Sequence, residues 1–270
     1  MPEGHVIHRL AARLTELYAG RPVQVSSPQG RFADEAALLD RTVLWSSDAV
    51  GKHLFIDFAA DRIVWIHLGL IGKLLFVPTD ELRAPATLRL RIAAGSTAAE
   101  LRGPQWCRLI TPGERDAVVA ASGPDPLRAD ADPEKAWAKV SRTSKPIAAV
   151  LMDQAAFAGV GNIFRAEVLY RHRLDPWLPA RDLPRDTFDA LWADLVGLMH
   201  YGVDEGRIDT VTDDHTPEAM ERPARVDRHG GEVYVYRRAG LPCHVCGTEV
   251  RTTELAGRNL YWCPTCQATR

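Results

Sequence analysis

The start of the chain has the hydrophobic period of an amphipathic helix. Its apolar residues recur every three or four positions, which places them on one helical face. They are Ile7, Leu10, Leu14, Leu17 and Tyr18. We predict a helix from Gly4 to about Ala19 that packs on a sheet.

Strand-like runs follow this helix. They are rich in β-branched and aromatic residues and are separated by Gly, Asp and Ala turns. These runs are residues 42–45, 53–58, 63–67 and 73–77. Residues 87–92, Thr-Leu-Arg-Leu-Arg-Ile, alternate strictly, as in a strand with one buried and one solvated face. Residues 1–112 are therefore predicted to form a β-sandwich or barrel domain with one leading helix.

The pattern changes at the Gly123-Pro124-Asp125-Pro126 turn, where a second domain begins. Helical patterns then extend to about Tyr201. The predicted helices include residues 146–154 and 163–172, which are joined by the tight turn Gly159-Val160-Gly161-Asn162.

The last part of the chain is less regular. Residues 204–230 are polar and charged and predict a loop with weak order, whereas Val-Tyr-Val-Tyr at 233–236 predicts a strand. We assign residues 124–230 to a helical domain that includes the loop, and residues 231–270 to a C-terminal module. The chain as a whole is of the α+β class.

The composition is that of a globular protein without a membrane partner. Of 270 residues, 46% are hydrophobic and 25% are charged, which suffices for a core. The longest uncharged apolar run, Ile63 to Gly72, is far shorter than the roughly 18 to 20 residues of a membrane span. Charged residues also interrupt the region where a signal peptide would have its apolar core. We expect a cytoplasmic monomer.

Charge is unevenly distributed along the chain. The net charge of −2 is unpromising for a nucleic-acid partner, but residues 182–221 hold eleven acidic residues against two basic ones. The rest of the chain is basic on balance. Residues 141–173, with five basic residues against two acidic ones, would meet a polyanion.

Four of the five cysteines have the spacing of a zinc ribbon. Cys243-x2-Cys246 and Cys263-x2-Cys266 can close a tetrahedral thiolate site around one structural Zn²⁺. A cytoplasmic chain disfavours the alternative of two disulfides. The fifth cysteine, Cys107, beside Trp106, has the character of a core residue.

The extreme N-terminus offers a candidate nucleophile. Removal of Met1 would leave Pro2 with a secondary amine at the start of a helix, where the pKa of an amine near 8 is lowered further. Such an amine attacking a sugar C1′ forms an iminium ion that acidifies the C2′ proton and permits elimination. Glu3 could act as general acid or base. A plain helix start would look the same.

Three further residues are candidates for phosphate contacts. Asn162 opens a helix after a glycine turn, where backbone amides can bind phosphate. Arg258 lies on the Gly257-Arg258-Asn259 turn expected between the strands of the ribbon, and Lys52 precedes a strand. A packed glycine turn, a solvated arginine and an exposed lysine are the ordinary alternatives.

Together these motifs resemble the formamidopyrimidine-DNA glycosylase and endonuclease VIII family over nearly the whole chain. The motifs that carry the resemblance are Met1-Pro2-Glu3-Gly4, Gly51-Lys52-His53-Leu54, His67-Leu68-Gly69-Leu70, Asp153-Gln154 with Gly159-Val160-Gly161-Asn162, and the ribbon ending Gly257-Arg258-Asn259-Leu260-Tyr261-Trp262-Cys263-Pro264. The likeness is strongest to the actinobacterial endonuclease VIII branch.

The resemblance implies a bifunctional DNA glycosylase and abasic-site lyase of base excision repair, with a β-sandwich, a helix–two-turn–helix domain and a zinc finger. It implies that Pro2 forms the Schiff base and that Glu3 is its acid/base partner. Lys52, Asn162 and Arg258 would contact lesion phosphates, with Lys52 assisting β-elimination and Arg258 δ-elimination. Leu70 would fill the void left by the extruded nucleotide.

Two departures from the family pattern affect DNA contacts. Gly69 and Ile71 flank Leu70 where the endonuclease VIII pattern has polar and aromatic residues, and the segment Ala120-Ala121-Ser122 lacks an arginine that some relatives carry. The lesion preference is expected to be for oxidised pyrimidines. The same chemistry on oxidised purines, such as 8-oxoguanine or formamidopyrimidine, and a non-catalytic zinc-ribbon protein that binds damaged DNA are the alternatives.

Overall fold

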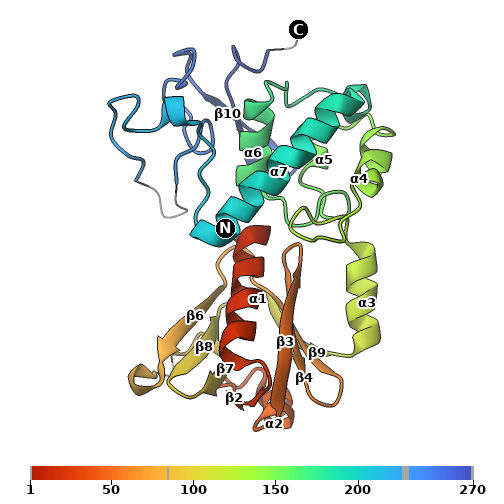
Figure 1. Ribbon diagram of the computed structural model, residues 1–270, viewed down its shortest axis with the longest axis vertical. Coiled ribbons are helices and arrows are strands. Elements are labelled where there is room, and N and C mark those ends of the chain that lie inside the picture. The colour runs from red at the N-terminus through yellow and green to blue at the C-terminus, as the bar shows by residue number, and fades with distance from the viewer. Residues whose placement is uncertain (1, 84, 227–230, 269–270) are drawn as a thin grey trace. The chain divides into compact units, whose positions relative to one another are not determined.

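The computed structural model describes residues 2–83, 85–226 and 231–268 and divides into two compact units, residues 1–121 and 122–270 (Figure 1). Each unit has its own hydrophobic core. No helix among the described residues is long and apolar enough to cross a membrane.

The first unit consists of two antiparallel sheets, a leading helix and two further helices. One sheet has the order β1-β3-β4-β5-β9 and the other β2-β7-β8-β6. The strands are β1 (Arg21–Pro22), β2 (Gln24–Ser26), β3 (Val43–Val50), β4 (His53–Phe58), β5 (Arg62–His67), β6 (Lys73–Pro78), β7 (Leu88–Ala94), β8 (Thr97–Arg102) and β9 (Trp106–Ile110). The helices are α1 (Gly4–Tyr18), α2 (Ala33–Leu39) and α3 (Pro112–Ala121), with a 3-10 turn at Thr79–Glu81. The predicted β-sandwich with a leading helix is confirmed.

Helix α1 packs as its period predicts. Ile7, Ala11, Leu14 and Tyr18 are buried, and they join one core with side chains of both sheets. Burying such a stripe of apolar side chains stabilises the helix more than its intrinsic propensity does. Figure 1 shows α1 beside β3, and the hydroxyl of Tyr18 donates to the carbonyl of Thr97 (3.3 Å).

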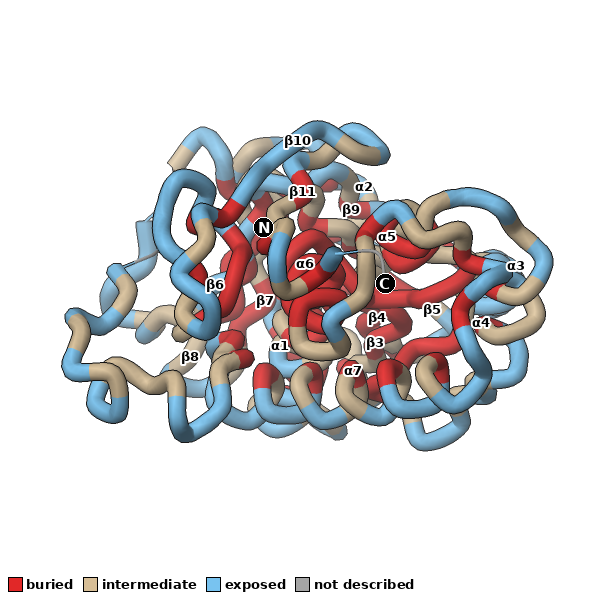
Figure 2. The backbone as a smooth tube through the Cα atoms, turned by 90° about the horizontal axis from the view of Figure 1, so that it is seen from above, coloured by how far each residue is buried: buried red, intermediate tan, exposed pale blue. Residues whose placement is uncertain are grey.

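The second unit combines four helices with a small hairpin. The helices are α4 (Pro133–Val140), α5 (Ile147–Val150), α6 (Asn162–Arg171) and α7 (Arg185–Glu205), with 3-10 turns at Ala180–Asp182 and Asp213–His215. Strands β10 (Arg251–Leu255) and β11 (Arg258–Trp262) form the hairpin. Every residue of α6 from Asn162 to Tyr170 is buried, so this helix is the centre of the unit (Figure 2).

Two predicted elements differ in the structure. The helix expected over 146–154 ends at Val150, and beyond it the side-chain amide of Gln154 donates to the carbonyl of Val160 (2.9 Å) and accepts from the N–H of Gly159 (3.1 Å). Gln154 thus closes a loop instead of continuing the helix. The strand expected at 233–236 was wrong, since backbone N–H groups there donate to a carboxylate on α6 rather than to a neighbouring strand.

The loop expected at 204–230 begins slightly later than predicted. Helix α7 extends to Glu205, where Gly206 in a left-handed conformation (φ 73°) ends it. Residues 206–226 contain the Asp213–His215 turn as their regular element, and residues 227–230 lie outside the described part of the chain.

Candidate metal centre and active-site residues

The four ribbon cysteines converge as their spacing predicts. Their Sγ atoms all lie within 4.8 Å of one another, with 3.9 Å between Cys243 and Cys266 and 3.4 Å between Cys246 and Cys263. A tetrahedral zinc with Zn–S bonds of about 2.3 Å needs sulfur atoms about 3.8 Å apart. The cluster therefore fits one Zn²⁺ held by four thiolates, a closed set that suits a structural ion.

A tyrosine of α6 lies directly behind this cluster. The hydroxyl of Tyr170 is 3.0 Å from the Sγ of Cys243 and 3.9 Å from that of Cys266. Burial raises the pKa of Tyr170 well above its usual range, so the hydroxyl stays protonated and can donate to a thiolate. Such a contact orients a metal ligand from outside the coordination shell and attaches the finger to the helical core.

The hairpin that follows the first pair of cysteines ends in a tight turn beside Arg258. Leu255 pairs with Arg258, and Ala256 and Gly257 between them both have positive φ (54° and 68°), as a two-residue hairpin turn requires. Arg258 is thus the first residue of β11 and is half-buried.

Asn162 lies against the same hairpin. Its side chain is 5% exposed, and its amide N–H donates to the carbonyl of Asn259 (2.9 Å). The structure therefore brings Asn162 and the neighbourhood of Arg258 together within the second unit, although 97 positions separate Asn162 from Asn259.

Pro2 and Glu3 lie at the start of α1. Pro2 is half-buried and Glu3 is fully buried, and the carbonyl of Glu3 accepts the N–H of Val6 (3.0 Å). His5 is buried beyond them, and burial lowers its pKa to about 4, so that it is neutral at pH 7. The helix N-terminus thus holds a shielded carboxylate next to the candidate amine.

Lys52 lies in the two-residue turn that joins β3 to β4, where Val50 pairs with His53. Thr15 of α1 and Ser47 of β3 exchange hydrogen bonds of 3.2 and 2.9 Å, and the two elements run antiparallel, since Gly20 donates to Leu44. From Ser47 to Val50, the last residue of β3, the strand advances about 10 Å, which about seven helical residues also cover. The turn that holds Gly51 and Lys52 follows in this direction, on the side of the N-terminal half of α1.

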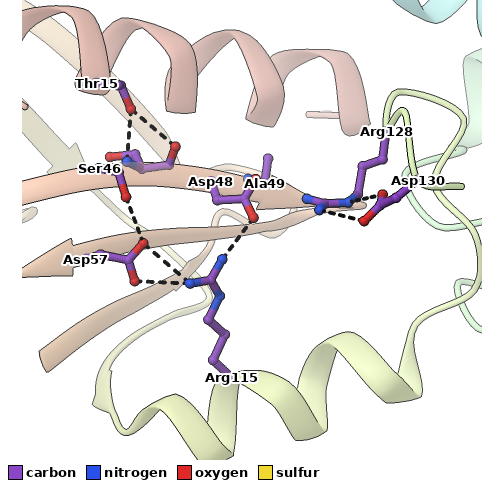
Figure 3. Close-up of polar contacts among 9 residues, drawn as sticks. Thr15, Ser46, Asp48, Ala49, Asp57, Arg115, Arg128 and Asp130 are labelled. Carbon is purple, nitrogen blue, oxygen red and sulfur yellow. Dashed lines mark hydrogen bonds and ion pairs between the residues drawn. The ribbon is translucent and has the colours of Figure 1, made fainter. Parts of the chain in front are cut away.

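The hairpin that carries Lys52 is braced on its other face. Arg115 of α3 donates to Asp48 on β3 (2.9 Å) and to Asp57 on β4 (3.3 Å), and Ser46 donates to Asp57 (3.1 Å) (Figure 3). The hairpin is held by α1 through Thr15 and by α3 through Arg115, which fixes the position of its tip.

Leu70 lies at the tip of the turn between β5 and β6. Leu70 is 55% exposed and its neighbour Ile71 is 80% exposed, so both display apolar side chains to solvent. The turn is closed by a hydrogen bond from Gly72 to Leu68 (3.1 Å), and a Cβ at Gly72 would lie 2.2 Å from the Leu68 carbonyl oxygen. An exposed apolar pair on a rigid turn is suited to insertion between bases.

Sequence reasoning missed a cluster of rings near Lys52. His67 stacks on Trp106 with centroids 4.5 Å apart, and Trp65 Nε1 donates to His53 Nδ1 (3.1 Å). Burial lowers the pKa of both histidines, and nearby positive charges, including that of Lys52, lower it further. The pKa of His53 falls to about 4. The sequence signal that could have predicted this cluster is the placement of aromatic and imidazole side chains at alternate strand positions.

Family comparisons cover all three parts of the chain. The profile described as the formamidopyrimidine-DNA glycosylase N-terminal domain matches residues 1–103, and that of the formamidopyrimidine-DNA glycosylase H2TH domain matches residues 122–214. The profile of the zinc finger found in FPG and IleRS matches residues 240–269. With the thiolate geometry, this last match assigns one structural zinc to the four cysteines.

Whole-chain relatives agree with these matches. The chain is 48% identical to Endonuclease 8 1 of Mycobacterium tuberculosis, covering 99% of this chain and 100% of the relative. It is 32% identical to Probable endonuclease 8 2 of Streptomyces coelicolor (99% and 94% covered) and 30% identical to Formamidopyrimidine-DNA glycosylase of Thermus thermophilus (99% and 98%).

The fold is also that of solved structures. Lactococcus lactis Fpg in a complex with abasic-site DNA has a TM-score of 0.80 at 20% sequence identity, and the match covers 99% of this chain and 100% of that one. MutM in a complex with DNA containing carbocyclic 8-oxo-G has a TM-score of 0.79 at 20% identity, with 99% and 100% covered. These likenesses establish the architecture of a β-sheet domain, a helical domain and a zinc finger.

Proposed function

The chain belongs to the formamidopyrimidine-DNA glycosylase and endonuclease VIII family of DNA glycosylases and abasic-site lyases, which act in base excision repair, and we propose that it excises oxidised pyrimidines through a Schiff base on Pro2. The observation that carries the proposed preference is the 48% identity to Endonuclease 8 1 across the chain, against 30% to Formamidopyrimidine-DNA glycosylase of Thermus thermophilus. Damaged DNA is accordingly the substrate, and the enzyme acts on it as a monomer.

The first chemical step uses the N-terminal amine. After removal of Met1, the nitrogen of Pro2 attacks C1′ of the damaged nucleotide and loses its proton, and the bond from C1′ to the base breaks as the leaving base is protonated. The C1′–O4′ bond then breaks, O4′ takes up a proton, and an iminium ion forms. Its positive nitrogen withdraws electrons from C2′, so a base can remove the C2′ proton and the C3′–O bond breaks. The fully buried Glu3 supports this proposal, because a shielded carboxylate beside the amine is placed to transfer these protons.

Phosphate contacts hold the substrate while this chemistry proceeds. Lys52, in the turn between β3 and β4, contacts the phosphate beside the lesion and assists the first elimination. Arg258 contacts a lesion phosphate from the finger. Asn162 contributes from α6, since an amide carries two N–H groups and Asn259 accounts for one of them. Leu70 fills the space left by the extruded nucleotide.

The test compares substrates in one series. Duplex oligonucleotides containing thymine glycol, 8-oxoguanine or an abasic site are incubated with the mature protein, with and without borohydride. We expect base release to be fastest on thymine glycol, and the trapped peptide to carry its cross-link on Pro2. Faster release of 8-oxoguanine would favour the oxidised-purine alternative. No release and no cross-link with an intact Pro2 amine would favour a protein that only binds damaged DNA.

A further inference from the structure

A buried arginine holds the hairpin that carries Arg258. Arg165, on α6, is completely buried and is the largest fully buried side chain among the described residues. Its guanidinium donates to the carbonyl of Leu255 (3.3 Å), to the carbonyl of Asn259 (3.4 Å) and to the side-chain oxygen of Asn162. All three acceptors are neutral oxygens, and two of them belong to the hairpin.

These two carbonyls lie on either side of the turn. Leu255 is the last residue of β10, Arg258 the first of β11 and Asn259 the second, with Ala256 and Gly257 between the strands. Leu255 belongs to the pair with Arg258 and Asn259 to the next pair, with Glu254, so the two carbonyls come from opposite strands of the hairpin. The carbonyl of Asn259 also accepts the amide of Asn162, so α6 contacts both flanks of the turn.

Arg165 anchors the hairpin at its turn, in addition to the core packing of Leu260. A two-stranded hairpin is only marginally stable by itself. The zinc cluster restrains its base, where Trp262 pairs with Arg251 and Cys263 follows, but Arg258 lies at the opposite end. Contacts of Arg165 at that end fix the turn and therefore the direction in which the Arg258 side chain leaves the strand.

We propose that Arg165 is the positioning residue for Arg258 and that it sets the efficiency of the second elimination. This inference rests on the proposed role of Arg258. In that step a base removes the C4′ proton, the C5′–O5′ bond breaks, and the electron pair leaves with the phosphate. A guanidinium held on that phosphate stabilises the departing charge, and a small displacement of the guanidinium weakens the effect.

The experiment separates the two eliminations on one substrate. An oligonucleotide with a labelled 5′ end and an abasic site gives a 3′-aldehyde fragment after β-elimination and a 3′-phosphate fragment after δ-elimination. Arg165→Met should lower the ratio of the second product to the first by about tenfold. Borohydride trapping, which reports the Pro2 chemistry, should change by less than about twofold.

Two further variants make the result specific. Arg171→Met removes an arginine from the same helix that contacts Asp194 and Thr210 rather than the hairpin, and the product ratio should stay at the wild-type value. Arg165→Lys keeps the charge, but a single ammonium lacks the fork that reaches both carbonyls. Its ratio should lie between those of the wild type and Arg165→Met. Bound zinc is measured for each variant, and the ratios are compared at equal zinc content.

The outcomes distinguish this inference from the proposed function. A wild-type product ratio in both Arg165 variants, with Arg258→Ala deficient in the second elimination, would overturn the positioning role alone. A wild-type ratio in Arg258→Ala would remove the proposed role of Arg258 and this inference with it. If Arg165→Met loses zinc, the product ratio of Arg165→Lys decides between the outcomes. A wild-type ratio in Arg165→Lys contradicts the proposal. A reduced ratio together with normal borohydride trapping supports it.

Discussion

The carboxylate of Glu167 accepts the backbone N–H of Tyr234 at 2.7 Å and thereby anchors the segment that leads into the zinc finger. The same carboxylate accepts the N–H groups of Val235 (2.9 Å) and Tyr236 (2.7 Å) and the hydroxyl of Thr210 (2.6 Å). Glu167 is fully buried on α6, so three consecutive backbone amides enclose a buried charge. Both the loop after α7 and the start of the finger are attached to α6 at this point.

Replacing Glu167 with Gln should destabilise the second unit. The amide has nearly the shape of the carboxylate, but its NH₂ group would face N–H donors and leave at least one of them without an acceptor. We expect a loss of about 2 to 4 kcal/mol in the free energy of unfolding, measured in urea. Glu205→Gln at the exposed end of α7 is the matched control. Equal unfolding free energies for the two variants would contradict the anchoring role of Glu167.

The arrangement around Glu167 shows where sequence reasoning succeeds and where it fails. Helix α1 was predicted because its apolar residues have a helical period, and strand β4 was predicted because its residues are rich in β-branched and aromatic side chains. Residues 233–236 have the composition of a strand, but their amides bind a carboxylate 67 to 69 positions earlier in the chain. No local pattern encodes that contact.

The residues of the candidate site also divide into those that the local sequence predicts and those that only the folded chain brings together. The zinc cluster was predictable because each Cys-x2-Cys pair already holds two ligands close together, and the chain only has to join the pairs. Pro2 and Glu3 are neighbours in sequence. Arg165 and its contacts with Leu255 and Asn259 span 90 and 94 positions, so its role appears only in the folded chain.

Acidification should destabilise the first unit through His53. Burial lowers the pKa of His53 from 6.5 to about 4, so the unfolded chain binds a proton that the folded chain rejects. The stabilisation of the folded state that depends on neutral His53 is complete above pH 6.5 and is lost as the pH falls from 6.5 towards 4. We expect His53 to account for on the order of 1 to 2 kcal/mol of lost stability between pH 7 and pH 5.

The variant His53→Asn isolates this effect. An asparagine can keep an acceptor for Trp65 Nε1, which donates to His53 Nδ1 at 3.1 Å, but it does not titrate. Unfolding measured at several pH values should therefore show a shallower loss of stability in the variant than in the wild type. The exposed His200 supplies the control His200→Asn. The assignment fails if His53→Asn and the wild type lose stability in parallel.

Replacing Cys263 with Ser should release zinc and weaken DNA binding. The variant keeps three thiolates, and the base of the β10–β11 hairpin loses its restraint, so Arg258 is no longer held in place. We expect at least about tenfold weaker binding to abasic-site DNA, measured by fluorescence anisotropy. Cys107→Ala, at a buried cysteine of the first unit, should retain one zinc per chain. Unchanged affinity in Cys263→Ser would show that the finger does not contribute to binding.

Blocking the amine of Pro2 should abolish the chemistry while leaving DNA binding intact. A protein that retains an N-terminal extension before Pro2 has an amide nitrogen there, which cannot form the iminium ion. We expect loss of base release, strand cleavage and borohydride trapping, with affinity for abasic-site DNA within about threefold of the mature protein. The matched control carries the same extension followed by a protease site that regenerates Pro2, and activity should return after cleavage. Full activity of the extended protein would exclude Pro2 as the nucleophile.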